Sequence, residues 1–350
     1  MSNTIMTVFG EVPIEKEYQW SWVEEYFTPL RELYENPDTT EIFVDRFDSI
    51  SIERNGRLEK TPITFDSNQS FQDFIIQLST ALNQPLNASS PILDARLPDC
   101  SRVCATLPDV TPQGATMTLR IAPKQHIRAE QLVGFGALNQ AMLDYLIEAI
   151  KAGKNIIVSG NTGSGKTTLL RALARYIPLT ERVIICEDTQ ELYIDGLPYA
   201  VSLESPKRSD SDVEMKTLIE TSLRMRPDRI WVGEIRKSSA ADAFLQAINT
   251  GHSGCMTTIH ANGCDDALSR LQYLIASQGM IDFDLAHKQI TGNVDVFVHA
   301  SRHERYGRKI TEIAEVTNGT LIPLFKFNGT THVPLKDEKI KRPTRTHLAD

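Results

Sequence analysis

The sequence predicts an α/β protein in which a small α+β domain precedes a larger domain built on a mainly parallel sheet. Three observations lead to this fold class. Between residues 155 and 277, short apolar runs alternate with amphipathic helical stretches, as in a parallel sheet covered by helices on both faces. Before residue 123, strands and helices follow in the irregular order of an α+β domain. A length of 350 residues is also long for a single core, so two domains are expected.

The N-terminal domain is expected to span residues 1–123, with residues 1–18 as a loose lead-in. Apolar residues recur at helical spacing over residues 21–34 and 70–82, whereas residues 85–98 are expected to be irregular. The strands of this domain are expected over residues 41–45, 49–54, 61–65, 102–107 and 115–121, with a hairpin turn at Asn55-Gly56.

The first helical stretch carries four aromatic residues, Trp20, Trp22, Tyr26 and Phe27. They fit either a helix lying on a membrane surface or a helix whose aromatic face packs on a small sheet. Glutamates on the same helix favour packing, because helices that bind lipid surfaces are usually rich in Lys and Arg.

A polar stretch without a clear period, residues 124–135, is expected to link the two domains. The larger domain then spans residues 136–327, and residues 328–350 form a polar tail. The strands of the larger domain are expected over residues 156–158, 183–186, 230–232 and 256–259. Its helices are expected over residues 137–152, 213–225, 240–249 and 265–277.

The stretch from Asn155 to Leu173 carries the most specific motif of the chain. A β-branched apolar run, a glycine-rich turn and a helix follow one another, and the turn reads G-x-x-x-x-G-K-T, the phosphate-binding P-loop. Glycines let successive N–H groups turn inward around phosphate oxygens, and the helix N-terminus adds its own unpaired N–H groups. The complete motif in this context argues against an accidental glycine-rich turn. The residues expected to bind the nucleotide are Gly160, Asn161, Thr162, Gly163, Ser164, Gly165, Lys166, Thr167 and Thr168.

Two side chains of this loop have specific expected roles. Lys166 should reach the β- and γ-phosphates of ATP, and the hydroxyl of Thr167 should coordinate Mg²⁺. ATP and Mg²⁺ are therefore the expected cofactors, and hydrolysis of ATP is the expected reaction.

Carboxylates follow two of the predicted strands, where α/β sheets bind ligands. Glu187 and Asp188 come directly after the strand over residues 183–186. We expect Glu187 to polarise the attacking water and Asp188 to hold Mg²⁺ through its waters. Glu234 follows the strand over residues 230–232, where P-loop enzymes place a carboxylate that serves Mg²⁺ or activates water.

Two histidines, His252 and His260, bracket the predicted strand over residues 256–259. A single histidine is more often a structural residue than a catalytic one. Neither has the neighbours that a zinc site needs. We expect both to hydrogen-bond the carboxylates of the nucleotide site or the γ-phosphate.

Composition restricts the function classes. A net charge of −8 argues against a general nucleic-acid coat, whose surface is basic. No apolar run reaches the length of a membrane span, and the N-terminus lacks the pattern of a signal peptide. The five cysteines are odd in number and show no paired zinc spacing, which is typical of free thiols in a reducing cytoplasm.

Four motifs occur in order: GNTGSGKTT, CEDTQEL, RMRPDRIWVGEIR and TGHSGCMTTIHAN. Together they resemble the secretion-superfamily traffic ATPases that serve type II and type IV secretion, type IV pili and conjugation. The resemblance is closest to the hexameric type IV secretion and conjugation ATPases. It covers roughly residues 20–325, because DTTEIFV, PILDARLPDCSRV and TLRI resemble the family's N-terminal domain.

The resemblance implies a RecA-like P-loop motor domain and a homohexameric ring at the cytoplasmic face of the inner membrane. The implied partners are inner-membrane channel components, coupling ATPases and a transported protein or DNA substrate. Arg102 and Arg120 match the arginines with which the family's N-terminal domain meets the phosphates. The family usually has glycine where Cys100 and Ser101 precede Arg102, and it assigns no role to Cys186.

Other function classes remain as alternatives. A nucleic-acid motor such as a ring helicase would need a basic and aromatic strip facing a pore, and no such strip is evident. A pilus or type II secretion ATPase shares the four motifs. A nucleotide-gated scaffold without activity would not need both Lys166 and Glu234.

Overall fold

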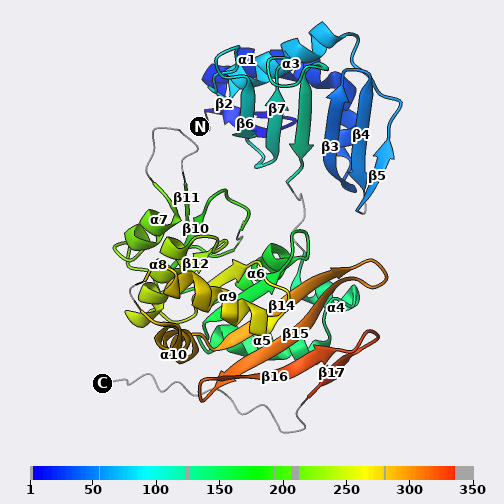
Figure 1. Cartoon of the computed structure of the whole chain (residues 1–350). Coiled ribbons are helices and arrows are strands. Elements are labelled where there is room, and N and C mark those ends of the chain that lie inside the picture. The colour runs from blue at the N-terminus through cyan, green and yellow to red at the C-terminus, as the bar shows by residue number, and fades with distance from the viewer. Residues whose placement is uncertain are drawn as a thin grey trace. The chain divides into compact units, whose positions relative to one another are not determined.

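The computed structural model describes residues 3–54, 56–122, 127–192, 194, 196–205, 213–279 and 281–335. The chain divides into two compact units, Met1–Gln125 and His126–Asp350, and each is described by itself (Figure 1).

The N-terminal unit is built on a six-stranded sheet in which every neighbouring pair is antiparallel, in the order β5-β4-β3-β8-β7-β6. Apolar side chains alternate along these strands, so one face of the sheet is buried and the other faces water. The strands are β3 (Thr39–Arg46), β4 (Ser49–Arg54), β5 (Arg57–Lys60), β6 (Ile92–Arg96), β7 (Arg102–Thr106) and β8 (Thr116–Arg120).

Helices α1 (Glu17–Phe27), α2 (Arg31–Glu35) and α3 (Asn68–Ala81) share one hydrophobic core with the buried face of this sheet. Trp20 and Phe27 are buried in that core, whereas 38% of Trp22 is exposed. The predicted packing of the aromatic face is therefore confirmed for Trp20 and Phe27. No helix among the described residues is both long and apolar enough to cross a bilayer.

Three predictions for this unit were wrong. Residues of the expected loose lead-in form an antiparallel hairpin, β1 (Thr4–Thr7) and β2 (Gly10–Pro13), because Phe9 and Val12 are buried in the core. Residues 61–65 form no strand; Pro62 lacks the N–H that a ladder needs, and Phe65 is buried instead. The stretch expected to be irregular contains β6, whose Leu93 and Ala95 point into the core.

The C-terminal unit is built on a nine-stranded sheet in the order β11-β10-β12-β13-β9-β14-β15-β16-β17. The first six strands in this order are parallel, and the last three extend the sheet in antiparallel fashion. The predicted mainly parallel sheet is confirmed. Its strands are β9 (Ile156–Gly160), β10 (Val183–Glu187), β11 (Val201–Glu204), β12 (Arg229–Val232), β13 (Met256–Ile259), β14 (Val296–His303), β15 (Gly307–Thr317), β16 (Thr320–Phe327) and β17 (His332–Pro334).

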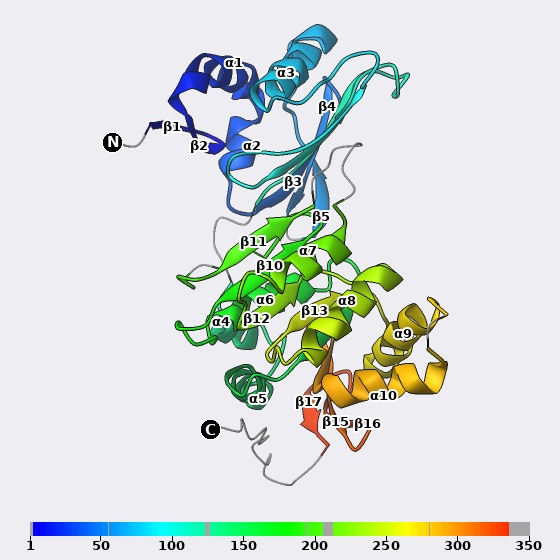
Figure 2. The same cartoon turned by 90° about the vertical axis from the view of Figure 1, so that its left-hand side faces the viewer.

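Helices cover both faces of this sheet (Figure 2). Ile156 and Val158 of β9 pack in one core with α4, α5 and α6, and Ile157 packs in a second core with α7 to α10. The central strands are thus apolar on both faces, as expected for a parallel sheet. The helices are α4 (Ala129–Gly134), α5 (Gln140–Lys151), α6 (Lys166–Ala174), α7 (Met215–Ser222), α8 (Ser238–Asn249), α9 (Cys264–Ala276) and α10 (Phe283–Asn293).

The expected linker and tail both contain ordered elements. Residues 129–134 form α4 because Ala129 and Leu132, three residues apart, are buried against the core. The predicted polar tail contains the strand β17, which pairs with β16. Linker residues 124–126 and tail residues 336–350 lie outside the described residues.

The hairpin between β6 and β7 depends on an unusual backbone angle at Cys100. The amide of Cys100 donates to the carbonyl of Leu97, and the amide of Leu97 donates to the carbonyl of Ser101. Cys100 adopts φ = +72°, the left-handed region in which glycine is preferred. Three-residue hairpin loops commonly end with a residue in this conformation. Cys100 therefore takes a conformation that a glycine would adopt at lower steric cost.

We expect Cys100→Gly to stabilise the N-terminal unit by about 0.5–1 kcal/mol, because glycine adopts the left-handed conformation without the steric cost of a Cβ. Urea denaturation would be followed by tryptophan fluorescence in a Trp231→Phe background, which leaves Trp20 and Trp22 as reporters. Cys104→Gly is the matched control. Cys104 lies exposed inside β7, where glycine should destabilise by a similar amount. Equal effects of both substitutions would contradict this account.

Candidate functional site

The P-loop connects the buried strand β9 to the helix α6, as predicted. Gly163 and Gly165 adopt φ = +71° and +99°, both in the region that favours glycine. Gly160 is required for a different reason. A Cβ at Gly160 would lie 2.1 Å from the carbonyl oxygen of Ala300 on the neighbouring strand β14, so no side chain fits. The loop thus has its sharp turns and its close backbone contact at glycines.

Lys166 begins α6 and is buried, with 8% of its surface exposed. Its ammonium group donates to the carbonyl oxygens of Gly160 at 2.7 Å and Asn161 at 3.1 Å. Burial lowers the pKa of Lys166, and the nearby carboxylate of Glu234 acts in the opposite direction. The charge of Lys166 is therefore held at the centre of the loop, facing Glu234.

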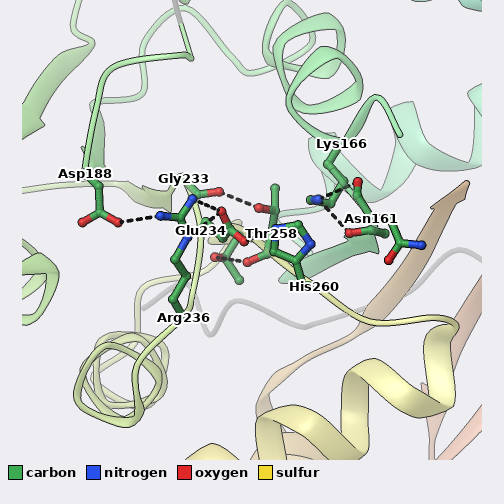
Figure 3. Close-up of polar contacts among 10 residues, drawn as sticks. Asn161, Lys166, Asp188, Gly233, Glu234, Arg236, Thr258 and His260 are labelled. Atoms are coloured by element: carbon green, nitrogen blue, oxygen red, sulfur yellow. Dashed lines mark hydrogen bonds and ion pairs between the residues drawn. The ribbon is translucent and has the colours of Figure 1, made fainter. Parts of the chain in front are cut away.

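Glu234 is the centre of a polar cluster at the ends of three strands (Figure 3). Its Oε1 lies 2.8 Å from Nε2 of His260, which follows β13. Its Oε2 accepts hydrogen bonds from Nε and Nη2 of Arg236 at 2.9 and 2.7 Å. Arg236 also lies 3.8 Å from the carboxylate of Asp188, which follows β10. The predicted residues Asp188, Glu234 and His260 are thus brought together, with Arg236 between the two carboxylates.

The surroundings of His260 disfavour its protonated form. Burial is the main cause of its lowered pKa, the positive charge of Lys166 adds to it, and Glu234 opposes it. The lowered pKa favours the neutral imidazole, whose Nε2 lies beside Oε1 of Glu234. The backbone around Glu234 is also fixed, because the hydroxyl of Thr258 donates to the carbonyl of Gly233 at 2.7 Å.

Glu187 lies in a different environment from Glu234. It is buried, and its Oε1 accepts the backbone amides of Glu191 and Leu192, both at 3.0 Å. Burial raises the pKa of Glu187 to about 7, although these two amides act against the shift. Gly233 is needed here too, since a Cβ on it would lie 2.9 Å from Cγ of Glu187. Glu187 therefore holds the turn that follows β10.

His252 lies at the opposite end of β13 from His260. Its Nδ1 lies 3.0 Å from the carbonyl oxygen of Ala247 at the end of α8 and 3.2 Å from the hydroxyl of Thr250. Within this unit, the prediction that His252 contacts the carboxylates of the nucleotide site is wrong. A parallel sheet separates the two ends of a strand, and a histidine before β13 cannot reach the edge where β13 ends.

The donor set of the loop and the cluster suits Mg²⁺. Thr167 offers a hydroxyl at the start of α6, and Asp188 and Glu234 offer carboxylates, all hard oxygen ligands. Among the described residues, no group of three or more His, Cys, Asp and Glu side chains is placed to hold a metal alone. Mg²⁺ usually takes few protein ligands and completes its shell with substrate phosphates and water.

Arg102 and Arg120 belong to the N-terminal unit and stand directly opposite each other on β7 and β8. Arg96 on β6 stands opposite Arg102, so three arginines form one row on the face away from the core. At the end of this row, Nε of Arg120 lies 3.8 Å from Oε1 of Glu41.

Sequence reasoning missed three residues of these clusters, Arg96, Arg236 and Thr258. Arg236 ends the quoted motif RMRPDRIWVGEIR and stands two residues after Glu234, which was the available signal. Arg96 lies six residues before Arg102 across a hairpin, and only the register of β6 and β7 makes them neighbours. Thr258 lies within a buried strand and carried no signal of its own.

Comparisons with known proteins agree with this architecture. The model of the family described as "Type II/IV secretion system protein" matches residues 24–298. An uncharacterized protein of Methanocaldococcus jannaschii is 39% identical over 212 residues; the match covers 58% of this chain and 29% of that protein's length. The type IV secretion system protein VirB11 of Brucella suis is 30% identical over 324 residues, covering 82% of this chain and 88% of that protein.

The solved structure of the Legionella pneumophila ATPase DotB has the same fold. It superposes with a TM-score of 0.64 and 24% sequence identity, covering 84% of this chain and 81% of DotB. The family model matches more than half of the residues, and the relative from Brucella is matched over most of both chains. The chain belongs to the type II/IV secretion system protein family.

Proposed function

We propose that this protein is an ATPase that acts as the motor of a bacterial type IV secretion or conjugation system. The observation that carries the proposal is the placement of Lys166 of the P-loop beside Glu234 and His260, at adjoining ends of β9, β12 and β13. A phosphate-binding loop facing a carboxylate is the arrangement that ATP hydrolysis needs.

In this proposal the residues of the P-loop and those of the polar cluster around Glu234 have different roles. Amides of the loop and Lys166 bind and orient the β- and γ-phosphates, and Thr167, Glu234 and Asp188 would hold Mg²⁺. The ion, when bound, neutralises charge on the phosphate oxygens. Glu234 accepts the proton of the attacking water. His260, whose Nε2 lies 2.8 Å from Oε1 of Glu234 and whose lowered pKa favours the neutral ring, would orient that carboxylate.

Glu187 takes a structural role in the proposal instead of the role of base. Its Oε1 is engaged by two backbone amides, and its carboxyl is buried behind Gly233. It shapes the turn that carries Asp188. The base is thus assigned to Glu234, which has one oxygen at His260 and the other at Arg236.

Arg102 and Arg120 would complete the site from the N-terminal unit by neutralising charge in the transition state. A planar and permanently charged guanidinium suits this role. Closure of the N-terminal domain would then couple hydrolysis to movement. As the family resemblance implies, six copies would form a ring at the cytoplasmic face of the inner membrane, contacting channel components and coupling ATPases and energising transport of a protein or DNA substrate.

The proposed reaction is tested by Lys166→Ala and Glu234→Gln in the purified full chain. Lys166→Ala should lose both nucleotide binding and turnover, because it removes the charge that faces the terminal phosphates. Glu234→Gln should bind ATP but lose about 10²-fold in kcat, because it removes the proton acceptor and leaves the shape. Phosphate release and binding of a fluorescent ATP analogue measure the two properties.

Glu187→Gln is the matched control for Glu234→Gln, since both change one strand-end carboxylate to an amide. It should retain most of the turnover. Loss of turnover in Glu187→Gln together with normal turnover in Glu234→Gln would mean that the two carboxylates have exchanged roles. Wild-type turnover in Lys166→Ala would remove the P-loop from the reaction. Stimulation by single-stranded DNA would favour a nucleic-acid motor instead.

The raised pKa of Glu187 predicts a pH dependence of stability. Because its pKa is about 7 in the folded chain against an ordinary 4.5, the folded state binds more protons between these values. The free energy of unfolding should therefore fall as pH rises from about 4.5 to about 7. Glu187→Gln should remove this loss and gain about 1–3 kcal/mol over the wild type at pH 8, with little difference at pH 4.5.

Urea denaturation in a Trp20→Phe, Trp22→Phe background checks this, because Trp231 of the C-terminal unit then remains as the fluorescent reporter. Glu220→Gln, an exposed substitution on α7, is the control and should behave like the wild type at both pH values. A stability difference between wild type and Glu187→Gln that does not change with pH would contradict the prediction.

The proposed role of the N-terminal unit predicts that Arg120→Ala slows hydrolysis, with kcat falling by a factor on the order of 10³ if the guanidinium stabilises the transition state. Steady-state kinetics measure kcat and KM for ATP. Arg57→Ala, at an exposed position of β5 in the same sheet, is the control. Unchanged kcat and KM in an Arg120→Ala protein that still folds and assembles would remove Arg120 from the site.

A further inference from the structure

A side chain from far along the sequence also contacts the P-loop. Arg308, near the start of β15, donates a hydrogen bond from Nε to the carbonyl oxygen of Gly163 at 2.8 Å. It also passes close to Gly165, where a Cβ would lie 3.7 Å from Cδ of Arg308. Arg308 lies outside the four motifs that identify the nucleotide site.

The antiparallel pair β14 and β15 supports the same part of the loop at further points. Arg302 stands directly opposite Arg308 in the register of these strands, and its Nη1 lies 3.7 Å from the position of a Cβ on Gly163. The carbonyl of Ala300, on β14, abuts Gly160 at the start of the loop. The loop is therefore bordered by the ends of two strands that follow it by about 140 residues.

The orientation of the loop carbonyls matters for phosphate binding. A carbonyl oxygen that faces a phosphate repels it, whereas an N–H attracts it. Lys166 binds the carbonyls of Gly160 and Asn161, and Arg308 binds that of Gly163. In a planar trans peptide, the C=O of Gly163 and the N–H of Ser164 point in opposite directions. Arg308 thus directs the amide of Ser164 to the inner side of the loop, where it now donates to the carbonyl of Asn161 at 3.2 Å.

We propose that Arg308 is a positioning residue for nucleotide binding: it holds the Gly163 peptide with its oxygen outward, so that the loop presents N–H groups to the phosphates. The proposal rests on the proposed function of the P-loop as the ATP site. The oriented Gly163 peptide would favour binding of the substrate and of the transition state equally. Loss of the Arg308 contact should therefore change KM more than kcat.

The test compares Arg308→Ala, Arg308→Lys and wild type for binding of N-methylanthraniloyl-ADP and for ATP hydrolysis by the full chain. Arg308→Ala should raise Kd and KM about tenfold, the loss expected for one charge-assisted hydrogen bond at an exposed position, and change kcat by less than about twofold. Lysine keeps the charge but places a methylene group where Nε of arginine stood. Arg308→Lys should therefore remain close to Arg308→Ala.

The matched control is Arg305→Ala. Arg305 is an exposed arginine in the same β14–β15 connection, and its guanidinium lies 5.5 Å from the ring centre of Tyr306. This variant should bind like the wild type. Thermal melting without nucleotide should give the same midpoint for Arg308→Ala and Arg305→Ala, which separates loop positioning from a general loss of stability.

The outcomes distinguish this proposal from the proposed function. If the wild type binds nucleotide and Lys166→Ala does not, but Arg308→Ala equals Arg305→Ala, the positioning role is overturned and the ATP site stands. Full recovery of binding by Arg308→Lys would show that charge alone matters and would also overturn it. If the wild type binds no nucleotide, the proposed function itself fails.

Discussion

The parallel register of β12, β13 and β9 is the constraint on which the candidate site depends. Parallel strands end at the same edge of a sheet, so the residues that follow them converge although they are far apart in sequence. Lys166, Glu234 and His260 meet in this way. The same geometry places His252 at the far edge, because it precedes β13 while His260 follows it. The position of a residue relative to its strand therefore decides whether it joins the site.

The two strand-end carboxylates show how the environment separates residues of one type. Glu187 is enclosed by backbone, and burial raises its pKa to about 7. Glu234 lies between His260 and Arg236, which orient its two oxygens. A buried carboxyl held by two amides supports a turn, whereas a carboxylate beside a neutral imidazole is suited to accept a proton. The proposed assignment of the base to Glu234 rests on this difference.

The antiparallel part of the large sheet also contacts the P-loop. The strand β14 pairs with β9 and brings the carbonyl of Ala300 against Gly160, and β15 brings Arg308 to Gly163. The sheet thus borders the outer side of the P-loop, whose glycines have no side chains to pack against it. This arrangement would allow the loop to keep the angles that phosphate binding requires without a side chain of its own at those positions.

Much of this protein was determined by its sequence alone. The alternation of apolar runs and amphipathic helices predicted the parallel sheet, because burial on both faces demands apolar residues at successive strand positions. The P-loop, Glu234 and His260 were found because their spacing to a strand is local. The departure from the family's glycine before Arg102 was also visible in the sequence, but only the structure shows that Cys100 adopts the left-handed conformation there.

Other features were decided only by the tertiary structure. Only a few buried apolar side chains hold three short elements in place: the hairpin at residues 4–13, β6 and α4. In the sequence, such a short apolar pattern cannot be distinguished from that of a loop. The row of Arg96, Arg102 and Arg120 depends on strand register. The buried state of Glu187 and the contact of Arg308 with Gly163 depend on segments that pack together from distant parts of the chain. Spacing along a sequence carries information about neighbours within one element, whereas contacts between elements arise only when the sheet is assembled.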